Sequence, residues 1–318
     1  MEIKKCLLIL LLCGMLLLVG CVNETDLSSI DQIESQEDIS EEEQTVSMND
    51  SVEKEEAPQG ETLAEENIFE EVAIVESNVS LEKTEWWKPK PNTSWQWQLK
   101  GTLNTKYNVD MYDIDLFDNS KEAIKSLQNK GIKVICYFSA GSYENWRIDK
   151  DDFPNEVLGN TLEGWEDEKW LDISKIDLLV PIMEARLDLA VEKGCNGVEP
   201  DNVDGYLNDN GFSLTSQDQL NYNKWFAEEA HKRGLTVGLK NDLDQIPELV
   251  NYFDFALNEQ CFEYDECETL LPFIEKGKAV FGVEYDLQPA EFCSKANDFN
   301  FDWLRMEYDL DGGRIACR

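Results

Sequence analysis

The chain has 318 residues and a formal net charge of −38, with 66 acidic against 28 basic side chains. A protein this acidic repels a phosphate backbone, which argues against nucleic acid as a partner and favours a neutral or cationic ligand. Hydrophobic residues make up 42% of the sequence, enough for a sizeable core, but the acidic residues are unevenly distributed along it.

Residues 1–20 have the pattern of a secretory signal peptide. Two lysines precede an apolar run from Cys6 to Val19, which is too short to span a bilayer comfortably. The run ends in Leu-Val-Gly-Cys at 18–21, which resembles a bacterial lipobox. The resemblance implies cleavage before Cys21 and lipidation of its thiol, so we expect a lipid anchor that holds the protein on the bacterial cell surface, outside the cytoplasm. An uncleaved N-terminal anchor helix is the alternative.

Residues 21–85 are predicted to form a disordered acidic linker. Between Val22 and Glu85 there are 21 Asp or Glu residues against two lysines, with a single aromatic residue. Such a segment buries too little apolar surface to offset its conformational entropy, and its like charges repel one another. A binding tail for a basic partner is the alternative interpretation.

Residues 86–318 are predicted to form one domain with an α/β fold. Apolar runs of strand length alternate with segments of helical apolar spacing, which is typical of a parallel sheet. The runs are 95–99, 109–114, 133–138, 197–200, 236–240, 253–257, 279–284 and 303–308, and the clearest helical segments are 121–130, 176–193 and 217–233. Eight strands in a domain of this length favour a closed (β/α)8 TIM barrel over an open sheet.

Six cysteines lie in this domain, and export would permit disulfides between them. Closeness in sequence predicts the pair Cys261–Cys267. The pair Cys293–Cys317 is predicted because these two cysteines bracket the last unit of the barrel. Cys136 and Cys195 lie within apolar strand patterns and are interpreted as buried thiols.

Carboxylates follow nearly every predicted strand. The C-terminal ends of TIM-barrel strands form the active-site rim, so these acids are expected to meet there. Asp and Asn after a strand also cap the next helix, which explains any single acid as well, but not the whole set. Lys240 ends an apolar strand and is a candidate cation to offset the clustered negative charge.

Clustered carboxyl groups suit the hydrolysis of a glycosidic bond. One carboxyl group protonates the leaving oxygen, and the other acts as a nucleophile or a base. Other common chemistries lack their motifs, since no G-x-S-x-G, P-loop or dinucleotide-binding glycine pattern occurs. The single histidine, His231, lies late in a predicted helix and is interpreted as structural. We expect no metal and no cofactor, with a divalent-metal enzyme as a distant alternative.

Several sequence blocks, in order through most of residues 86–286, resemble glycoside hydrolase family 114, the endo-α-1,4-polygalactosaminidases and their relatives. The blocks are WQWQL at 95–99, YDID at 112–115, CYFSAGS at 136–142, ENWR at 144–147, WLDI at 170–173, GVEPDN at 197–202, LKND at 239–242, NEQC at 258–261 and VEY at 283–285. The resemblance implies a TIM barrel and an endo-acting hydrolase. Its implied partner is a polysaccharide of α-1,4-linked, partly deacetylated galactosamine, which is cationic.

The same resemblance implies the site residues. The family's catalytic aspartate falls on Asp201, expected as nucleophile or base, and its catalytic glutamate on Glu259, expected as general acid or acid/base. Asn196 departs from an expected aspartate, but it begins a strand, away from the rim. The residues expected to bind substrate are Asp113, Asp115, Tyr137, Glu199, Asn202, Lys240, Asn241 and Glu284.

Two other functions stay open on the sequence. One is a non-catalytic carbohydrate-binding barrel on the cell surface, which would need neither Asp201 nor Glu259. The other is a glycosidase for a different α-galactoside-type glycan, because one fold hosts many chemistries.

Overall fold

The computed structural model describes residues 85–318. The expected signal peptide, the expected lipidation site Cys21 and all of the expected acidic linker except its last residue lie outside the described residues. Among the helices of residues 85–318, none has the length and apolar character needed to cross a membrane.

Eight parallel strands form the centre of the fold, and each lies within two residues of a predicted strand. They are β1 (Trp95–Gln98), β2 (Met111–Asp115), β3 (Lys133–Ser139), β7 (Gly197–Asp201), β8 (Thr236–Lys240), β9 (Phe255–Glu259), β10 (Val280–Glu284) and β11 (Asp302–Met306). They pair in this order, and β12 (Arg314–Ala316) adds an antiparallel strand beside β11. The predicted eight-stranded barrel is therefore confirmed.

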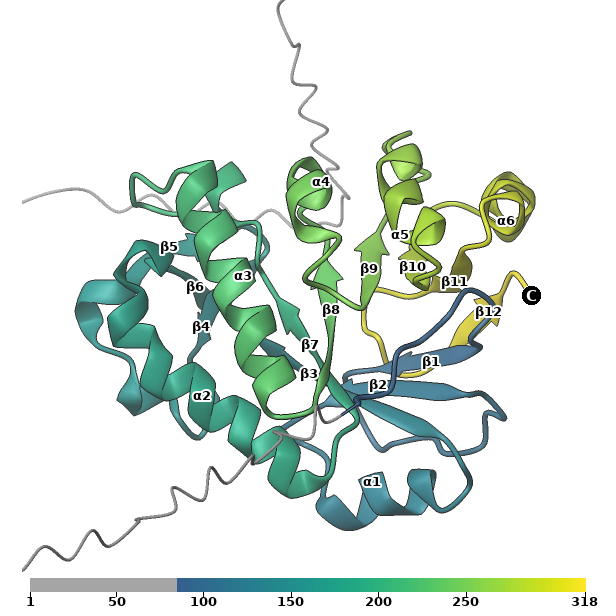
Figure 1. Cartoon of the computed structure of the whole chain (residues 1–318), viewed down its shortest axis with the longest axis horizontal. Helices are drawn as coiled ribbons and strands as arrows, with labels where there is room; N and C mark the ends of the chain where they lie inside the picture. The colour runs from purple at the N-terminus through teal and green to yellow at the C-terminus, as the bar shows by residue number, and fades with distance from the viewer. Residues whose placement is uncertain (1–84) are drawn as a thin grey trace, which may run out of the picture. The chain divides into compact units, whose positions relative to one another are not determined.

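Helices lie around the outside of the strands (Figure 1). They are α1 (Lys121–Gln128), α2 (Ile176–Lys193), α3 (Ser216–Lys232), α4 (Ile246–Leu249), α5 (Leu271–Glu275) and α6 (Pro289–Asp298). The three helices predicted from apolar spacing correspond to α1, α2 and α3. In the described part of the chain no α-helix separates β1 from β2, and a strand rather than a helix follows β11, so the helical layer is less regular than a (β/α)8 pattern predicts.

The barrel closes between β1 and β11 through individual hydrogen bonds. The Trp95 indole donates to the Asp302 carbonyl at 2.8 Å. The segment after β11 completes the seam, because the backbone of Leu99 donates to the Leu310 carbonyl at 3.0 Å and the Gln96 amide to the Gly312 carbonyl at 2.8 Å. These bonds hold the first and last parallel strands together.

Alternate residues of the strands build two apolar layers. Side chains such as Trp97, Ile135, Leu257 and Phe281 fill the barrel interior. The intervening residues, such as Phe138, pack beneath the helices. Because the interior is filled, a ligand cannot lie inside the barrel, and the active site of a TIM barrel is expected at the C-terminal ends of the strands and the loops that follow them.

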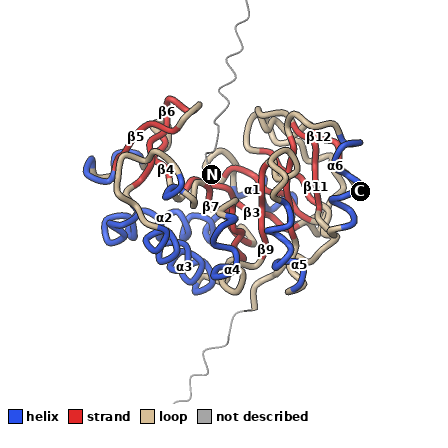
Figure 2. The backbone as a smooth tube through the Cα atoms, turned by 90° about the horizontal axis from the view of Figure 1, so that it is seen from above, coloured by secondary structure: helices blue, strands red, loops and turns tan. Residues whose placement is uncertain are grey.

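The chain between β3 and α2 forms a second, three-stranded antiparallel sheet, which was not expected from the sequence. It consists of β4 (Ser142–Glu144), β6 (Trp165–Leu171) and β5 (Leu158–Leu162), in that order. Figure 2 shows this sheet at one side of the barrel, with β11 and β12 at the other. Four of the seven residues of β6 are charged, so a search for apolar runs passes over it.

Three disulfides cross-link the barrel. The predicted pairs Cys261–Cys267 and Cys293–Cys317 are confirmed. Cys136 and Cys195 are buried as predicted, but their interpretation as thiols was wrong, because they form the third disulfide. Cys136 lies on β3 and Cys195 just before β7, and these strands are neighbours although 59 residues separate the two cysteines.

Candidate active site

Lys240, at the end of β8, lies among three carboxylates. Its ammonium nitrogen is 2.9 Å from Asp201 Oδ1, 3.2 Å from Glu199 Oε1 and 3.2 Å from Glu259 Oε2. Only 2% of its side chain is exposed. Burial alone lowers the pKa of Lys240, but the charges of Asp201, Glu259 and Glu199 outweigh burial and raise that pKa well above its ordinary value. The ammonium therefore stays charged and holds the three acids together.

Asp201, at the end of β7, is held as a carboxylate. The Tyr137 hydroxyl donates to its Oδ2 at 2.9 Å, while Lys240 contacts its Oδ1. Burial raises the pKa of Asp201, but the Lys240 charge and the hydrogen bonds from Lys240 and Tyr137 lower it below its ordinary value. An ionised, partly exposed carboxylate at a strand end suits a nucleophile or a base.

Glu259 ends β9 and faces the same space. The Tyr285 hydroxyl donates to its Oε1, and Lys240 contacts its Oε2. Burial, followed by the charge of Glu259, raises the pKa of Tyr285, so the phenol keeps its proton and remains a donor. Of the Glu259 side chain, 27% is exposed. Each of the two predicted catalytic carboxyl groups is thus fixed by Lys240 and one tyrosine.

Tight turns keep these side chains at the rim. Asn202, Asn241 and Gln260 directly follow β7, β8 and β9, and each has a positive φ between 49° and 64°. Asparagine enters this left-handed region more readily than most residues do. Gly141 packs so closely against this turn that a Cβ there would lie 1.7 Å from the Asn202 carbonyl oxygen.

A cavity of about 860 Å³ opens above these groups. Its wall includes both predicted catalytic residues and five of the predicted binding residues, namely Asp115, Tyr137, Asn202, Lys240 and Asn241. Both carboxylate oxygens of Asp115 already have partners within the protein. Arg147 contacts its Oδ2 at 2.7 Å, and the backbone amides of Phe117 and Asp118 donate to its Oδ1.

Asp113 and Glu199 are predicted binding residues that the structure places beneath the cavity, with no exposed surface. Burial, and then the neighbouring Glu199, raise the pKa of Asp113 well above its ordinary value. Burial also raises the pKa of Glu199, which accepts a hydrogen bond from the Trp97 indole at 3.1 Å. The pair therefore lies out of reach of a ligand in the cavity, and Glu199 is linked to that cavity through Lys240 and Trp97, which both line it.

Glu284 also lies away from the cavity. It is on the outward face of β10, whereas Val283 and Tyr285 on either side face the interior. Its Oε1 accepts from the Phe262 backbone at 3.0 Å and from the Trp303 indole at 3.3 Å. Burial raises the pKa of Glu284 to about 7. The expectation that this residue contacts substrate does not match its position.

The structure adds acids that the list of predicted binding residues lacked. Glu168 on β6 lines the cavity, and burial raises its pKa to about 7. Asp204 and Asp242 also line it, with pKa values raised by burial and then mainly by neighbouring carboxylates, to about 6 and about 8. The sequence could have indicated Asp204 and Asp242 as cavity residues, since both follow predicted strands. It gave no such indication for Glu168, because the strand that carries it was not predicted.

Two residues judged unimportant for chemistry lie at the opposite end of the barrel. The Asn196 side-chain oxygen accepts from the Val134 backbone at 3.0 Å, just before β7 begins. His231 lies 2.8 Å from Asp254 Oδ2 and stacks on Trp86, with ring centroids 4.1 Å apart. Both residues link elements of the fold.

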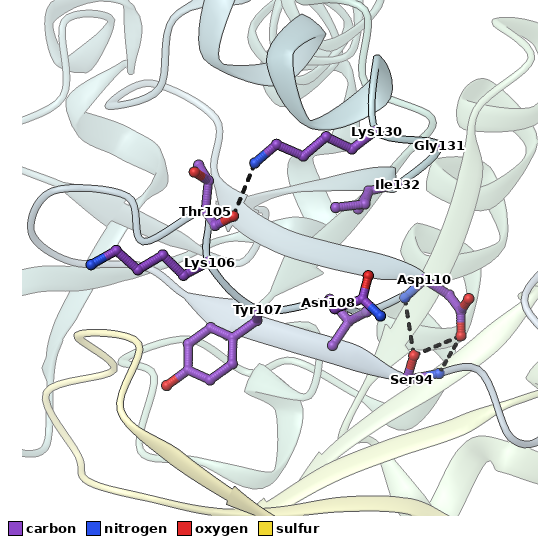
Figure 3. A pocket seen from close by; sticks show the side chains of 10 residues that line it. Ser94, Thr105, Lys106, Tyr107, Asn108, Asp110, Lys130, Gly131 and Ile132 are labelled. Carbon is purple, nitrogen blue, oxygen red and sulfur yellow. Dashed lines mark hydrogen bonds between the residues drawn. The ribbon is translucent and has the colours of Figure 1, made fainter.

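A smaller cavity of about 400 Å³ lies beside the start of β2 and β3. Figure 3 shows two hydrogen-bonded links at this cavity, Ser94 to Asp110 at 2.6 Å and Lys130 to the Thr105 carbonyl at 3.0 Å. No pair of carboxyl groups faces this cavity, so the candidate chemistry belongs to the larger one. Within residues 85–318, no group of three or more His, Cys, Asp or Glu side chains is placed to hold a metal ion.

The chain is similar to known glycoside hydrolases. Residues 76–318 match the model of glycoside-hydrolase family GH114. The crystal structure of Aspergillus fumigatus Ega3 in complex with galactosamine is 44% identical and has a TM-score of 0.70, covering 73% of this chain and 98% of Ega3. The glycoside hydrolase domain of PelA from Pseudomonas aeruginosa shares the fold, at 12% identity and a TM-score of 0.57 over 72% of this chain and 99% of that one. No curated protein sequence matched.

Proposed function

The chain belongs to glycoside hydrolase family GH114, and from this we propose that it cleaves internal bonds of an α-1,4-linked, galactosamine-containing polysaccharide. The observation that carries the proposal is the pair of carboxyl groups, Asp201 and Glu259, bridged by Lys240 at the floor of the larger cavity. The likeness to a protein solved with galactosamine supports an amino sugar as the substrate class.

In the proposed mechanism the two acids have separate roles. Asp201, ionised and hydrogen-bonded, attacks the anomeric carbon of the sugar. Glu259 must take up a proton before the bond breaks; it gives that proton to the departing glycosidic oxygen and then takes a proton from the water that releases the product. Lys240 and Tyr137 hold the Asp201 carboxylate in place, and Tyr285 orients Glu259.

The spacing of the acids favours retention of anomeric configuration. The ammonium nitrogen of Lys240 contacts Asp201 Oδ1 at 2.9 Å and Glu259 Oε2 at 3.2 Å. The distance between these two carboxylate oxygens therefore cannot exceed the sum of those two distances. Carboxyl groups lie ~5–5.5 Å apart in retaining enzymes and ~6.5–9.5 Å apart in inverting ones. We expect proton NMR of the first product to show the α anomer before mutarotation. A β anomer appearing first would contradict the nucleophilic role of Asp201.

The function is tested directly with defined oligomers. Purified protein is offered α-1,4-galactosamine oligomers, their N-acetylated forms and an α-galactoside oligomer without amino groups, with products measured by mass spectrometry. We expect internal cleavage of the chains that carry free amines. Binding without cleavage would favour the non-catalytic barrel, and cleavage of the amine-free oligomer alone would favour a different α-galactoside as substrate.

The acidic cavity predicts salt-dependent binding. Asp204, Asp244, Glu168 and Glu266 all line it and would attract protonated amines. Raising the ionic strength from about 20 mM to about 200 mM shortens the screening length, so KM for galactosamine oligomers should rise severalfold. Fully N-acetylated oligomers carry no charge, and the salt dependence of their binding affinity, measured by calorimetry beside that of the charged oligomers, is the matched control. An equal salt effect on both substrates would mean that the charge of the cavity is unrelated to recognition.

The proposed location follows from the first 21 residues. A lipid on Cys21 would hold the enzyme on the bacterial cell surface, with the linker of residues 21–85 between the membrane and the barrel. Metabolic labelling with a fatty acid should mark the wild-type protein and not a Cys21→Ser variant. Equal labelling of both proteins would exclude this anchor.

A further inference from the structure

Exposed apolar side chains concentrate in the larger cavity. Eight large hydrophobic side chains are exposed in the part of the chain that the structure describes. Five of the eight line this one cavity, namely Trp146, Trp165, Leu207, Tyr264 and Tyr308. Such clustering indicates a surface that a ligand covers, because scattered exposure would place most of them elsewhere.

Two tryptophans lie on the wall formed by the small sheet. Trp146 follows β4 and is 51% exposed, and Trp165 begins β6 and is 60% exposed. Asn145 joins the two segments, since its backbone donates to the Asp167 carbonyl at 3.1 Å and its side chain to Asp167 Oδ1 at 2.7 Å. Both rings are therefore presented to the cavity by a hydrogen-bonded framework.

A tyrosine occupies the other side. Tyr308 follows β11, is 56% exposed, and stacks on Tyr285 with ring centroids 4.3 Å apart and planes 21° apart. Its hydroxyl donates to Asp286 Oδ2 at 3.0 Å. The ring is held against the same Tyr285 that hydrogen-bonds Glu259.

The catalytic pair lies between these aromatic side chains. Tyr137 on β3, the strand that leads into the small sheet, bonds to Asp201, while Glu259 bonds to Tyr285, on which Tyr308 stacks. The strand order β3-β7-β8-β9-β10-β11 runs from one aromatic group to the other. Figure 2 shows the small sheet and β11 at opposite sides of the barrel.

We propose that Trp146 and Trp165 bind one sugar unit of the polysaccharide and that Tyr308 binds another, on opposite sides of the bond that is cleaved. This assignment of subsites rests on the proposed function. An aromatic ring packs against the apolar C–H face of a pyranose, and the acids Glu168 and Asp204 line the same cavity, where they can pair with its protonated amines. Contacts on both sides of the scissile bond favour internal cleavage. They should also make kcat/KM higher for long chains than for short ones.

The experiment compares short and long chains with full-length protein. The double variant Trp146→Ala/Trp165→Ala and the single variant Tyr308→Ala are assayed on galactosamine tetramers and decamers. We expect kcat/KM on the decamer to fall about tenfold in each, the scale of one or two lost ring contacts, with a clearly smaller loss on the tetramer. Trp→Phe replacements and Tyr308→Phe should restore most of it. The cleavage position in the decamer should shift in opposite directions in the two alanine variants.

Ile148→Ala is the matched control. Ile148 belongs to the same loop as Trp146 and is 90% exposed, but it does not line the cavity, so its loss should leave both substrates unaffected. Thermal unfolding of every variant separates a loss of contact from a loss of fold.

The outcomes separate this proposal from the proposed function. If the wild type cleaves both chains and the alanine variants lose activity equally on both, or lose none, the aromatic subsites are refuted. If the wild type cleaves neither, the proposed function fails, and the subsites are judged from affinity measured by calorimetry in an Asp201→Asn background. A decamer bound about tenfold more weakly without the tryptophans supports them, and unchanged or absent binding overturns them.

Discussion

Replacing Asp201 by Asn is expected to lower kcat on galactosamine chains by about 10⁴-fold or more, since an amide cannot attack the anomeric carbon and loss of a nucleophile is among the largest single effects in enzymes. Asn has nearly the same shape, and the Asp201 side chain is partly exposed, so the barrel should remain folded. Steady-state kinetics and thermal unfolding measure both effects.

Glu259→Gln should behave differently because it removes an acid rather than a nucleophile. We expect a loss of about 10²–10⁴-fold on galactosamine chains, the usual contribution of general acid catalysis. A glycoside with an activated aryl leaving group needs little protonation, so its first bond cleavage should be nearly unaffected in this variant. Azide should accelerate turnover of that substrate, since a small anion can replace the activated water.

Glu307→Gln is the control for both substitutions. Glu307 also follows a barrel strand, but its side chain is 76% exposed and it does not line the cavity. Its kcat/KM should stay close to the wild-type value. If Asp201→Asn retained activity within about tenfold of the wild type, the assignment of the nucleophile would have to be abandoned, because that loss is far below the effect of a missing nucleophile.

Lys240→Met should affect both stability and catalysis. It leaves Glu199, Asp201 and Glu259 without their shared cation, and removal of one partner from a buried ion pair costs about 3–5 kcal/mol of folding free energy. The Lys240 charge is the largest of the influences that lower the pKa of Asp201. Its loss should raise that pKa, move the acid limb of the kcat profile to higher pH, and reduce kcat near neutral pH by about 10²-fold or more.

The pH dependence of stability distinguishes this explanation from a simple packing defect. Without the ammonium, the folded-state pKa values of the buried acids rise above their unfolded values, so the folded state gains protons relative to the unfolded state. The variant should then be less destabilised at low pH and increasingly destabilised as pH rises through those folded-state pKa values. Urea unfolding at several pH values measures this, and a loss independent of pH would contradict it. Lys295→Met, which removes an exposed lysine paired with Asp265, should change stability by less than about 1 kcal/mol.

The sequence by itself was sufficient for the barrel and for the centre of its candidate site. Strand length and apolar character are local properties, so eight runs in one domain predicted eight strands. Parallel strands of a barrel end at one rim, which placed Asp201, Lys240 and Glu259 close together before any contact was known. The resemblance then distinguished Asp201 and Glu259 from the other acids at that rim.

Only the tertiary structure decided which of the other acids reach the cavity and what forms its walls. Glu284 faces outward and Asp113 lies one layer below, because strand register and depth set the side and the height of a side chain. Cys136 meets Cys195, and the charged strand β6 presents Trp165, only because distant segments pair with each other. Local periodicity does not indicate which distant segments pair. The sequence therefore identified the chemistry of the site, and the tertiary structure determined the shape and lining of its cavity.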